Sequence, residues 1–296
     1  MSKGSLYALA AYTLWGVLPI YWKLIQTAST LEIVANRIIW SFALLVLLLA
    51  VKKQWAGLRA AVSGPRILGV FLISALLLGV NWSVYIYGVN AGFIVETSLG
   101  YFINPLVSVL LGVIILREKL RSLQWVSVAL AVIGVGYLTM NYGRLPWIAL
   151  VLAVTFGLYG LAKKVAPLGS FYGLTLETGM LCLPSLGFLI LLAARGEGTL
   201  GNADPLTSLL LVMTGPVTTV PLLLFGAAAR RIDLSMLGLL QYIAPTLQFL
   251  IGVLVYHEPF NAATLVGFCI IWTALAILWG EGMIERQRRL RALSTQ

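Results

Sequence analysis

Long apolar runs recur from one end of this chain to the other, and they decide what it can fold into. A helix of about 20 apolar residues crosses a bilayer core about 30 Å thick. Ten such runs have the predicted bounds 5–22, 32–51, 66–87, 94–116, 122–140, 146–164, 170–193, 207–229, 235–256 and 261–280. An open sheet edge does not survive in lipid, and these runs lack the alternation of barrel strands. The sequence therefore predicts an all-α integral membrane protein with ten transmembrane helices.

The composition excludes the main alternatives. Hydrophobic residues make up 60% of the 296 residues and charged residues only 10%, whereas a soluble domain has about 25% charged residues. A cytosolic enzyme or a secreted disulfide scaffold of this size could not cover so much apolar surface. The two cysteines, Cys182 and Cys269, lie inside apolar runs, and His257 is the only histidine. We therefore expect no metal site and no cofactor.

The positions of Lys and Arg predict the orientation. If the ten runs cross the membrane in turn, 16 of the 20 basic residues, Lys163 among them, fall on the face that holds the N-terminus. Three fall on the other face, namely Lys23, Arg144 and Arg195. Because cytoplasmic loops carry the excess of Lys and Arg, both termini are expected in the cytoplasm. The net charge of +10 is thus interpreted as a topology signal, not as a nucleic-acid-binding surface.

The two halves of the chain resemble each other. Segment 98–120 matches segment 238–260 at an offset of 140, and the shared residues include a Pro, a Gly and a Glu. The recurring residues are Leu99, Ile103, Pro105, Leu110, Gly112, Val113 and Glu118, which reappear as Leu239, Ile243, Pro245, Leu250, Gly252, Val253 and Glu258. The tripeptide that ends at Glu32 also recurs, ending at Glu177. The first five runs therefore correspond to the last five.

This repeat predicts the domain organisation. Because five is an odd number, the second copy must lie inverted in the membrane, as in many secondary transporters whose substrate site lies near the midplane. Residues 1–143 are expected to form the first five-helix repeat, residues 144–281 the inverted second repeat, and residues 282–296 a basic cytoplasmic tail. A duplication that serves packing alone is the alternative interpretation.

Five stretches of the sequence resemble a known family. They are NRIIWSF (36–42), NWSVYIYGVN (81–90), ETSLGYFINPLV (96–107), TTVPLLLFGAAARR (218–231) and LGLLQYIAPT (237–246). They resemble RarD-type members of the EamA family, in the drug/metabolite transporter superfamily, over nearly the whole chain. The resemblance implies a multi-pass protein of the bacterial inner membrane with ten helices in two inverted repeats. It also favours export of amino acids, other small metabolites or chloramphenicol-like drugs.

Polar residues inside the apolar runs are the candidates for substrate binding, because such residues are expensive in a bilayer and are usually functional. In run 94–116, polar and small residues that include Asn104 recur every four residues and share one helical face. Run 235–256 carries a matching stripe. The predicted substrate-binding residues are Arg37, Asn81, Trp82, Tyr85, Asn104, Thr218, Gln241 and Gln248. Helix packing is the alternative explanation for the glycines of these stripes.

Charged residues and prolines add further candidates. Arg37, well inside a run, is expected either to bind a substrate carboxylate or to pair with Glu96. Glu96 and Glu32 are candidates for a coupled proton, because a low-dielectric site favours the neutral carboxyl group. The prolines predict helix breaks that expose backbone carbonyls, and they are Pro105, Pro245 and Pro221. Trp22, near the end of a run, is expected to anchor at the membrane interface.

These residues together predict a secondary active transporter that works by alternating access, with proton coupling as an option. The alternative is a membrane protein without transport activity, such as a lipid-modifying enzyme or a sensor. Such an enzyme would need a His or carboxylate cluster at depth, and the sequence supplies one His. The expected partners are a small-molecule substrate and membrane lipids but no nucleic acid, and the chain is expected to be a monomer or a homodimer.

Overall fold

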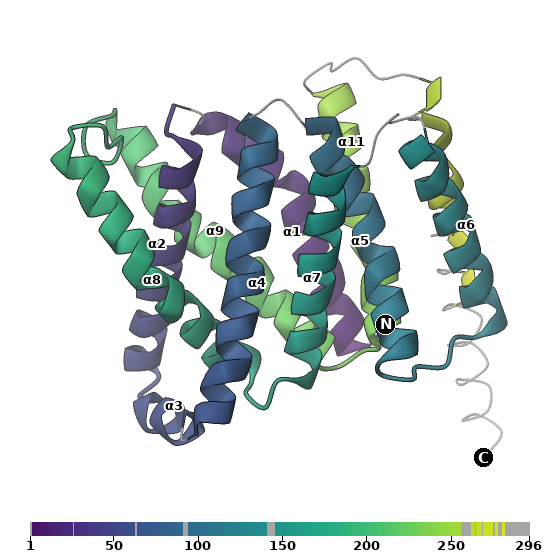
Figure 1. Ribbon diagram of the computed structural model, residues 1–296, viewed down its shortest axis with the longest axis horizontal. Helices are drawn as coiled ribbons and strands as arrows, with labels where there is room; N and C mark the ends of the chain where they lie inside the picture. The colour runs from purple at the N-terminus through teal and green to yellow at the C-terminus, as the bar shows by residue number, and fades with distance from the viewer. Residues whose placement is uncertain are drawn as a thin grey trace.

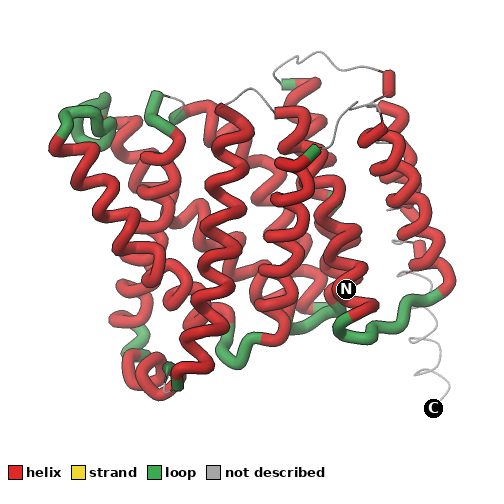
Figure 2. The backbone as a smooth tube through the Cα atoms, in the orientation of Figure 1, coloured by secondary structure: helices red, strands yellow, loops and turns green. Residues whose placement is uncertain are grey.

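The computed structural model describes residues 2–255, apart from 26, 63, 91–93 and 141–145, and residues 262–263, 265–267, 269–274, 276–277 and 280–281. All regular secondary structure in these residues is helical. Figure 1 shows most of the helices standing side by side, with α9 running obliquely behind them, and Figure 2 shows the short loops that join them. The described part of the chain is thus a bundle of helices, as the apolar runs predict.

Eleven helices have defined bounds within the described residues. They are α1 (Lys3–Leu24), α2 (Thr30–Val51), α3 (Trp55–Ala61), α4 (Pro65–Asn90), α5 (Ile94–Ile114), α6 (Ser122–Met140), α7 (Trp147–Val165), α8 (Ser170–Ala194), α9 (Pro205–Ala229), α10 (Leu234–Gln241) and α11 (Ile243–Leu254). Eight of the predicted runs coincide with single helices. Run 235–256 is divided between α10 and α11, and α3 is a short helix that the apolar runs did not predict.

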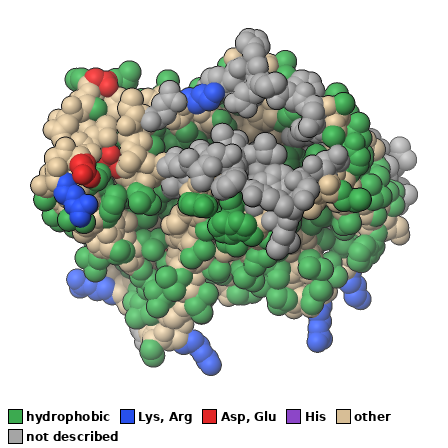
Figure 3. Space-filling view, turned by 45° about the horizontal axis from the view of Figure 1, so that its top comes forward, with side chains coloured by type: hydrophobic (Ala, Val, Ile, Leu, Met, Phe, Trp, Pro, Cys, Tyr) green, Lys and Arg blue, Asp and Glu red, His purple; other side chains and the backbone are tan. Residues whose placement is uncertain are grey.

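Seven helical stretches in the described residues are long and apolar enough to cross a membrane. These are Thr30–Val51, Pro65–Tyr85, Ser122–Met140, Trp147–Val165, Ser170–Ala194, Pro205–Ala229 and the joined stretch Leu234–Ile251. Side chains on the outside of the bundle are apolar, for example Leu183, which is 77% exposed. Figure 3 shows hydrophobic side chains over the flank of the molecule and several Lys and Arg side chains that project from its lower edge. This distribution fits a multi-pass membrane protein.

Two ends of the bundle can be told apart. The upper end of Figure 1 carries the loop 25–29 between α1 and α2 and the loop 195–204 between α8 and α9. The lower end carries α3 and the loop 166–169 between α7 and α8. At the upper end α2 and α9 begin with side-chain caps, which satisfy N–H groups that have no partner within the helix. Ser29 accepts from the Glu32 amide at 3.3 Å, and Asp204 accepts from the Thr207 amide at 3.0 Å.

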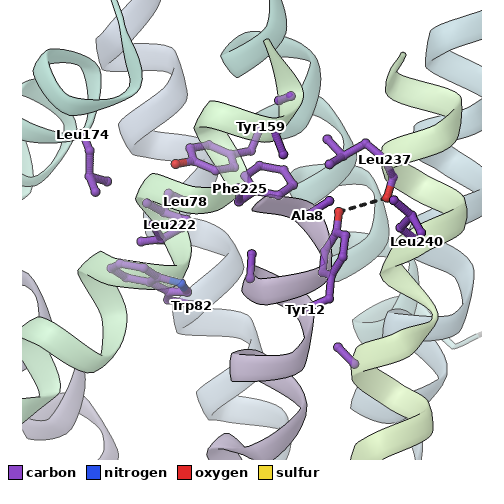
Figure 4. Close-up of a cluster of buried hydrophobic side chains, with 14 of the residues drawn as sticks. Ala8, Tyr12, Leu78, Trp82, Tyr159, Leu174, Leu222, Phe225, Leu237 and Leu240 are labelled. Atoms are coloured by element: carbon purple, nitrogen blue, oxygen red, sulfur yellow. Dashed lines mark hydrogen bonds between the residues drawn. The ribbon is translucent and has the colours of Figure 1, made fainter. Parts of the chain in front are cut away.

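The helices of the two halves pack against each other. Helix α1 packs on α9, α10 and α11, while α7 packs on α4 and α5. Figure 4 shows the core at this crossing, where Tyr12 of α1 donates a hydrogen bond from its hydroxyl to the Leu237 carbonyl of α10 at 3.0 Å. The ring of Phe225 from α9 stacks on Tyr159 from α7 at 6.0 Å between centroids.

Two glycines permit close helix crossings. A Cβ atom on Gly215 of α9 would lie 2.5 Å from the backbone carbonyl carbon of Trp40 in α2. A Cβ atom on Gly238 of α10 would lie 2.7 Å from the backbone oxygen of Pro105 in α5. Backbone atoms cannot give way as a flexible side chain can, so these positions require glycine if the helices are to approach this closely.

The prolines act differently from the prediction. Pro105 and Pro221 lie inside the continuous helices α5 and α9, so the predicted breaks at these two positions are wrong. A proline removes one backbone hydrogen bond, and the flanking bonds can keep the helix continuous. The described helices are interrupted instead at Tyr242, between α10 and α11, three residues before Pro245.

Candidate substrate-binding cavity

A cavity lies inside the bundle between helices of both halves. Its empty space, about 800 Å³ including the part open to solvent, suits a small molecule rather than a macromolecule. The lining residues are Tyr12, Trp15, Leu18, Pro19, Trp22, Arg37, Asn81, Trp82, Tyr85, Tyr101, Asn104, Phe156, Leu222, Gln241, Ala244, Pro245 and Gln248. On α1 they span Tyr12 to Trp22, the half that ends at the upper end of the bundle. The cavity therefore extends from the middle of the bundle toward its upper end.

Arg37 is held between two indole rings at the cavity wall. Its guanidinium carbon lies 4.7 Å from the ring centroid of Trp22 and 4.6 Å from that of Trp82. Its Nε donates a hydrogen bond to Thr218 Oγ1 at 3.0 Å, and the residue is only 9% exposed. Among the described residues no carboxylate forms an ion pair with it. The protein thus fixes a planar cation at the cavity and supplies aromatic faces that stabilise its charge.

Asn104 presents an acceptor that has no partner in the described structure. The residue is 2% exposed, it lines the cavity, and its Oδ1 is buried without a hydrogen bond. Leaving a buried acceptor unpaired costs about 1–3 kcal/mol. Buried polar atoms of this kind usually have a partner, and one without calls for an explanation. A hydrogen-bond donor on a bound molecule would satisfy this oxygen.

Two other cavity amides hold helices together. Asn81 Nδ2 donates to the Leu152 carbonyl at 3.0 Å and to Thr155 Oγ1 at 2.9 Å, which joins α4 to α7. Gln248 Nε2 donates to the Trp15 carbonyl at 3.2 Å, which joins α11 to α1. The Trp15 carbonyl is free to accept because Pro19, four residues later, has no N–H.

Aromatic side chains close the cavity toward the lower end. This aromatic floor consists of Tyr12, Trp15, Phe156, Tyr159 and Phe225. Its rings contact one another, with centroids 5.6 Å apart for Trp15 and Phe156 and 5.2 Å apart for Phe156 and Phe225. Figure 4 shows Tyr12, Phe225 and Tyr159 in succession across the bundle. The packed rings separate the cavity from the lower end of the molecule.

The structure brings most of the predicted binding residues to one place. The predicted residues that line the cavity are Arg37, Asn81, Trp82, Tyr85, Asn104, Gln241 and Gln248, together with Pro245. Thr218 reaches the site through its hydrogen bond with Arg37.

Five cavity aromatics were missed or misassigned, and Tyr12 and Phe156 of the aromatic floor are among those missed. Tyr101 was missed, although it lies three residues before Asn104 and hence on the same helical face. Its ring contacts Tyr85 at 5.6 Å. Trp15 of the aromatic floor was missed as well. Trp22 was expected to anchor at the membrane interface, but it lies over Arg37 instead.

The predicted proton-coupling carboxylates lie apart from the cavity or outside the described residues. Glu32 is 1% exposed, and its Oε1 accepts from the backbone amides of Thr199 at 2.7 Å and Leu200 at 3.1 Å. Its Oε2 is buried and has no hydrogen-bond partner among the described residues. Glu32 therefore attaches the start of α2 to the loop between α8 and α9. The side chain of Glu96 lies outside the described residues, as does His257.

Across the residues that the structure describes, no group of three or more His, Cys, Asp or Glu side chains is placed to hold a metal ion.

Comparison with known proteins gives the family. Residues 2–140 match the EamA-like transporter family. Protein RarD from Streptomyces exfoliatus is 45% identical over 97% of this chain and 92% of its own length. The chloramphenicol-sensitive protein RarD from Pseudomonas aeruginosa is 31% identical over 98% of both chains. A solved crystal structure shares the fold, with a TM-score of 0.68 and 20% identity over 93% of this chain and 96% of that one.

The cavity and the apolar helices define a membrane transporter. The chain belongs to the EamA family, and its similarity to RarD proteins extends over nearly its whole length. The resemblance inferred from the sequence is thereby confirmed.

Proposed function

We propose that this chain is a secondary active transporter that moves small, partly apolar metabolites or amphipathic drugs across the bacterial inner membrane by alternating access. The observation that carries the proposal is the buried Arg37, which contacts the rings of Trp22 and Trp82 at the wall of the cavity. A charged side chain inside a membrane protein is expensive and is usually kept for a substrate or ion pathway. The family description favours transport over a lipid-modifying enzyme or a sensor.

The helix packing supports two inverted repeats. The sequence offset pairs α1 with α7, α4 with α9, and α5 with α10 and α11. Helix α1 packs on α9, α10 and α11, and its counterpart α7 packs on α4 and α5, the counterparts of those helices. The same cross-packing in both halves supports ten helices arranged as repeats 1–143 and 144–281, followed by the basic tail 282–296. With both termini in the cytoplasm, the cavity extends toward the outside.

The cavity also supports alternating access. It extends toward the upper end, while the aromatic floor closes the path to the lower end. A carrier must have one side open and the other closed in each state, with the substrate site between them. Movement of one repeat against the other would then separate the floor and close the upper end.

The lining indicates the chemistry of the substrate. Arg37 suits an acidic or strongly polar group, Asn104 Oδ1 suits a hydrogen-bond donor, and the rings of Trp82, Tyr85 and Tyr101 suit an apolar or aromatic part. Amino acids and chloramphenicol-like compounds combine these features, and export is the proposed direction. Membrane lipids are the other proposed partner, nucleic acid is not, and the protein acts as a monomer or a homodimer. Glu96 and Glu32 stay candidates for a coupled proton.

Ligand binding by the purified protein tests the proposal. Chloramphenicol and phenylalanine are titrated while tryptophan fluorescence and melting temperature are followed, because a ligand that binds the folded state stabilises it. We expect at least one probe to change the fluorescence of the cavity tryptophans and to be taken up into proteoliposomes. Arg37→Met should weaken its binding by about tenfold or more, whereas Gly187→Ala, at an open position in α8, should not. A protein that neither binds nor transports any such compound would contradict the proposal.

A further inference from the structure

A second buried charged cluster lies outside the cavity, between α4, α7 and α8. Glu177 of α8 is 0% exposed, and its Oε2 accepts from Lys163 Nζ of α7 at 2.7 Å. Ser74 of α4 donates to its Oε1 at 2.6 Å, and the Tyr159 hydroxyl donates to its Oε2 at 3.3 Å. We call these four residues the ion-pair cluster. One carboxylate thus joins a helix of the first half to two helices of the second half.

The ion-pair cluster lies directly beyond the aromatic floor. Tyr159 belongs to both, because its hydroxyl contacts Glu177 while its ring stacks on Phe225. Lys163 lies in the last turn of α7, and Glu177 lies two turns into α8, so both are near the lower end of the bundle. Any movement that opens the floor to the lower end must pull on these contacts.

A contribution to folding stability does not by itself explain why Lys163 and Glu177 form a buried ion pair. The count of basic residues groups Lys163 with the face that holds the N-terminus, and the structure shows that its side chain is only 3% exposed. Taking two charges out of water costs about as much as their attraction returns, and apolar residues of similar size often serve as well. Removing the charge of one partner, however, leaves the other buried and uncompensated, which is strongly unfavourable. A buried pair is therefore sensitive to the gain of a single proton.

Two cations lie near the start of α8. Lys52 of α2 lies over the ring of Phe171 at 5.4 Å, and Arg230, after α9, donates to backbone carbonyls of the loop between α7 and α8. Helix α4 contributes a hydroxyl and no charge to the cluster. Within the described residues, Glu177 is the one carboxylate of this cluster. If it becomes neutral, Lys163 has no anionic partner among the described residues and keeps only the rings of Phe71 and Tyr159, whose centroids lie 6.0 and 5.3 Å from its Nζ.

We propose that Glu177 is the proton-binding carboxylate of the transport cycle. While Glu177 is ionised, its contacts hold α4 to α7 and α8 and keep the lower end closed. When its carboxylate takes up a proton from the aqueous phase on that side, Lys163 keeps its positive charge but loses its partner. The ammonium group then gains by moving into water, which favours separation of α4 from α7 and α8. This proposal rests on the proposed transport function, which assigns the lower end as a gate.

Hydrogen exchange tests the proton step without any substrate. The full-length protein is reconstituted in nanodiscs, and exchange of peptides from the end of α7 and the start of α8 is measured between about pH 5 and pH 8 and divided by the intrinsic rate. Wild-type protection in these peptides should fall by about tenfold or more toward low pH. Glu177→Gln, which cannot ionise, should be weakly protected and independent of pH.

Matched variants keep the result decisive. Glu197→Gln makes the same chemical change at an exposed position and should behave as wild type. Ser74→Ala removes a donor to the carboxylate but no charge, so it should move the midpoint of the response to higher pH. This variant decides the matter if Glu177→Gln does not fold. Any one of three outcomes overturns the proposal. The first is a pH response that is unchanged in Glu177→Gln, and the second is a midpoint that does not move in Ser74→Ala. The third is loss of the response in Glu32→Gln instead.

Transport separates this proposal from the function on which it rests. Wild-type proteoliposomes should accumulate labelled chloramphenicol when a pH gradient is imposed. Glu177→Gln should lose this accumulation but keep exchange of labelled for unlabelled chloramphenicol. If the variant accumulates the drug as wild type does, Glu177 is not the coupling group. If wild type moves no chloramphenicol in either assay, the proposed function fails for this compound, and the hydrogen-exchange result still decides whether Glu177 responds to protons.

Discussion

At the scale of single residues, Arg37 sets the character of the cavity. Its guanidinium lies over the rings of both Trp22 and Trp82, and Thr218 accepts a hydrogen bond from its Nε. Arginine suits this position because its planar group stacks on aromatic faces and is more weakly hydrated than an ammonium group. The same arrangement orients the cation for a ligand and lowers the cost of keeping it in the bundle.

Arg37→Lys tests whether the shape of the cation matters as well as its charge. The lysine variant keeps a positive charge but cannot stack between two rings or donate to Thr218 in the same geometry. We expect its affinity for a bound probe to fall by about tenfold, measured by titration of tryptophan fluorescence. Equal affinity in the wild type and the lysine variant would show that the stacked geometry is unimportant.

Asn104→Leu should separate binding from stability. The substitution removes the buried Oδ1 that has no partner, so the melting temperature should stay the same or rise, by up to a few degrees. Probe affinity should nevertheless fall, because the acceptor for the ligand is lost. Asn81→Leu is the matched control, since it breaks two hydrogen bonds to α7 and should lower the melting temperature. A lower melting temperature for Asn104→Leu would mean that Asn104 is structural.

At the scale of helices, close approach replaces the hydrophobic effect as the source of specificity, because lipid is as apolar as the helix surfaces. Helix α9 contacts α2 at Gly215, and α10 contacts α5 at Gly238. In both places the backbones of the two helices lie against each other. Side-chain amides then join the helices, and the bond from Gln248 to the Trp15 carbonyl uses an acceptor that a proline has released. Polar groups inside the bundle thus serve packing as well as binding.

Gly215→Ala should disrupt the contact between α2 and α9. Its Cβ would lie 2.5 Å from a backbone carbon of Trp40, so the helices must separate, and we expect a loss of about 1–3 kcal/mol in unfolding free energy. The measurement is thermal unfolding in detergent. Gly187→Ala in α8 is the control, because its Cβ meets nothing within 4 Å, and its stability should be unchanged or slightly higher. Equal stability of both variants would contradict a close crossing.

The sequence predicts where helices lie along the chain better than it predicts which helices pack against one another. Run length located eight helices because the thickness of a bilayer sets a simple rule. It did not find α3, which is too short to span, or the interruption at Tyr242. Asn104 and Arg37 were found because a polar group in an apolar run is visible in the sequence itself. Trp22 was misassigned because it lies near a helix end, and only the packing of other helices decides whether such an end is exposed or buried.

At the scale of the whole molecule, the cross-packed halves place one cavity between them. The aromatic floor and the ion-pair cluster lie on its lower side, while Glu32, the repeat counterpart of Glu177, binds amides of a loop at the upper end. Related carboxylates thus occupy different environments at the two ends. An inverted repeat in one conformational state would show this kind of asymmetry.

Cysteine labelling tests the proposed orientation of the halves. Single cysteines replace Lys53, at the lower end, and Asn202, at the upper end, in a chain that carries Cys182→Ser and Cys269→Ser. Both positions are exposed. An impermeant maleimide should label the Asn202→Cys variant in intact cells and the Lys53→Cys variant only after permeabilisation. The reverse pattern would overturn the assignment of the lower end to the cytoplasm.

The buried positive charge of Arg37 has a consequence for energy supply. Moving one elementary charge through the full membrane potential is worth about 2.3 kcal/mol per 100 mV. If the empty carrier shifts Arg37 relative to the electric field, its return step carries positive charge and depends on voltage. When an anionic substrate occupies the site, the charges cancel and the loaded step does not. The membrane voltage, as well as any ion gradient, would then set the direction of net flux.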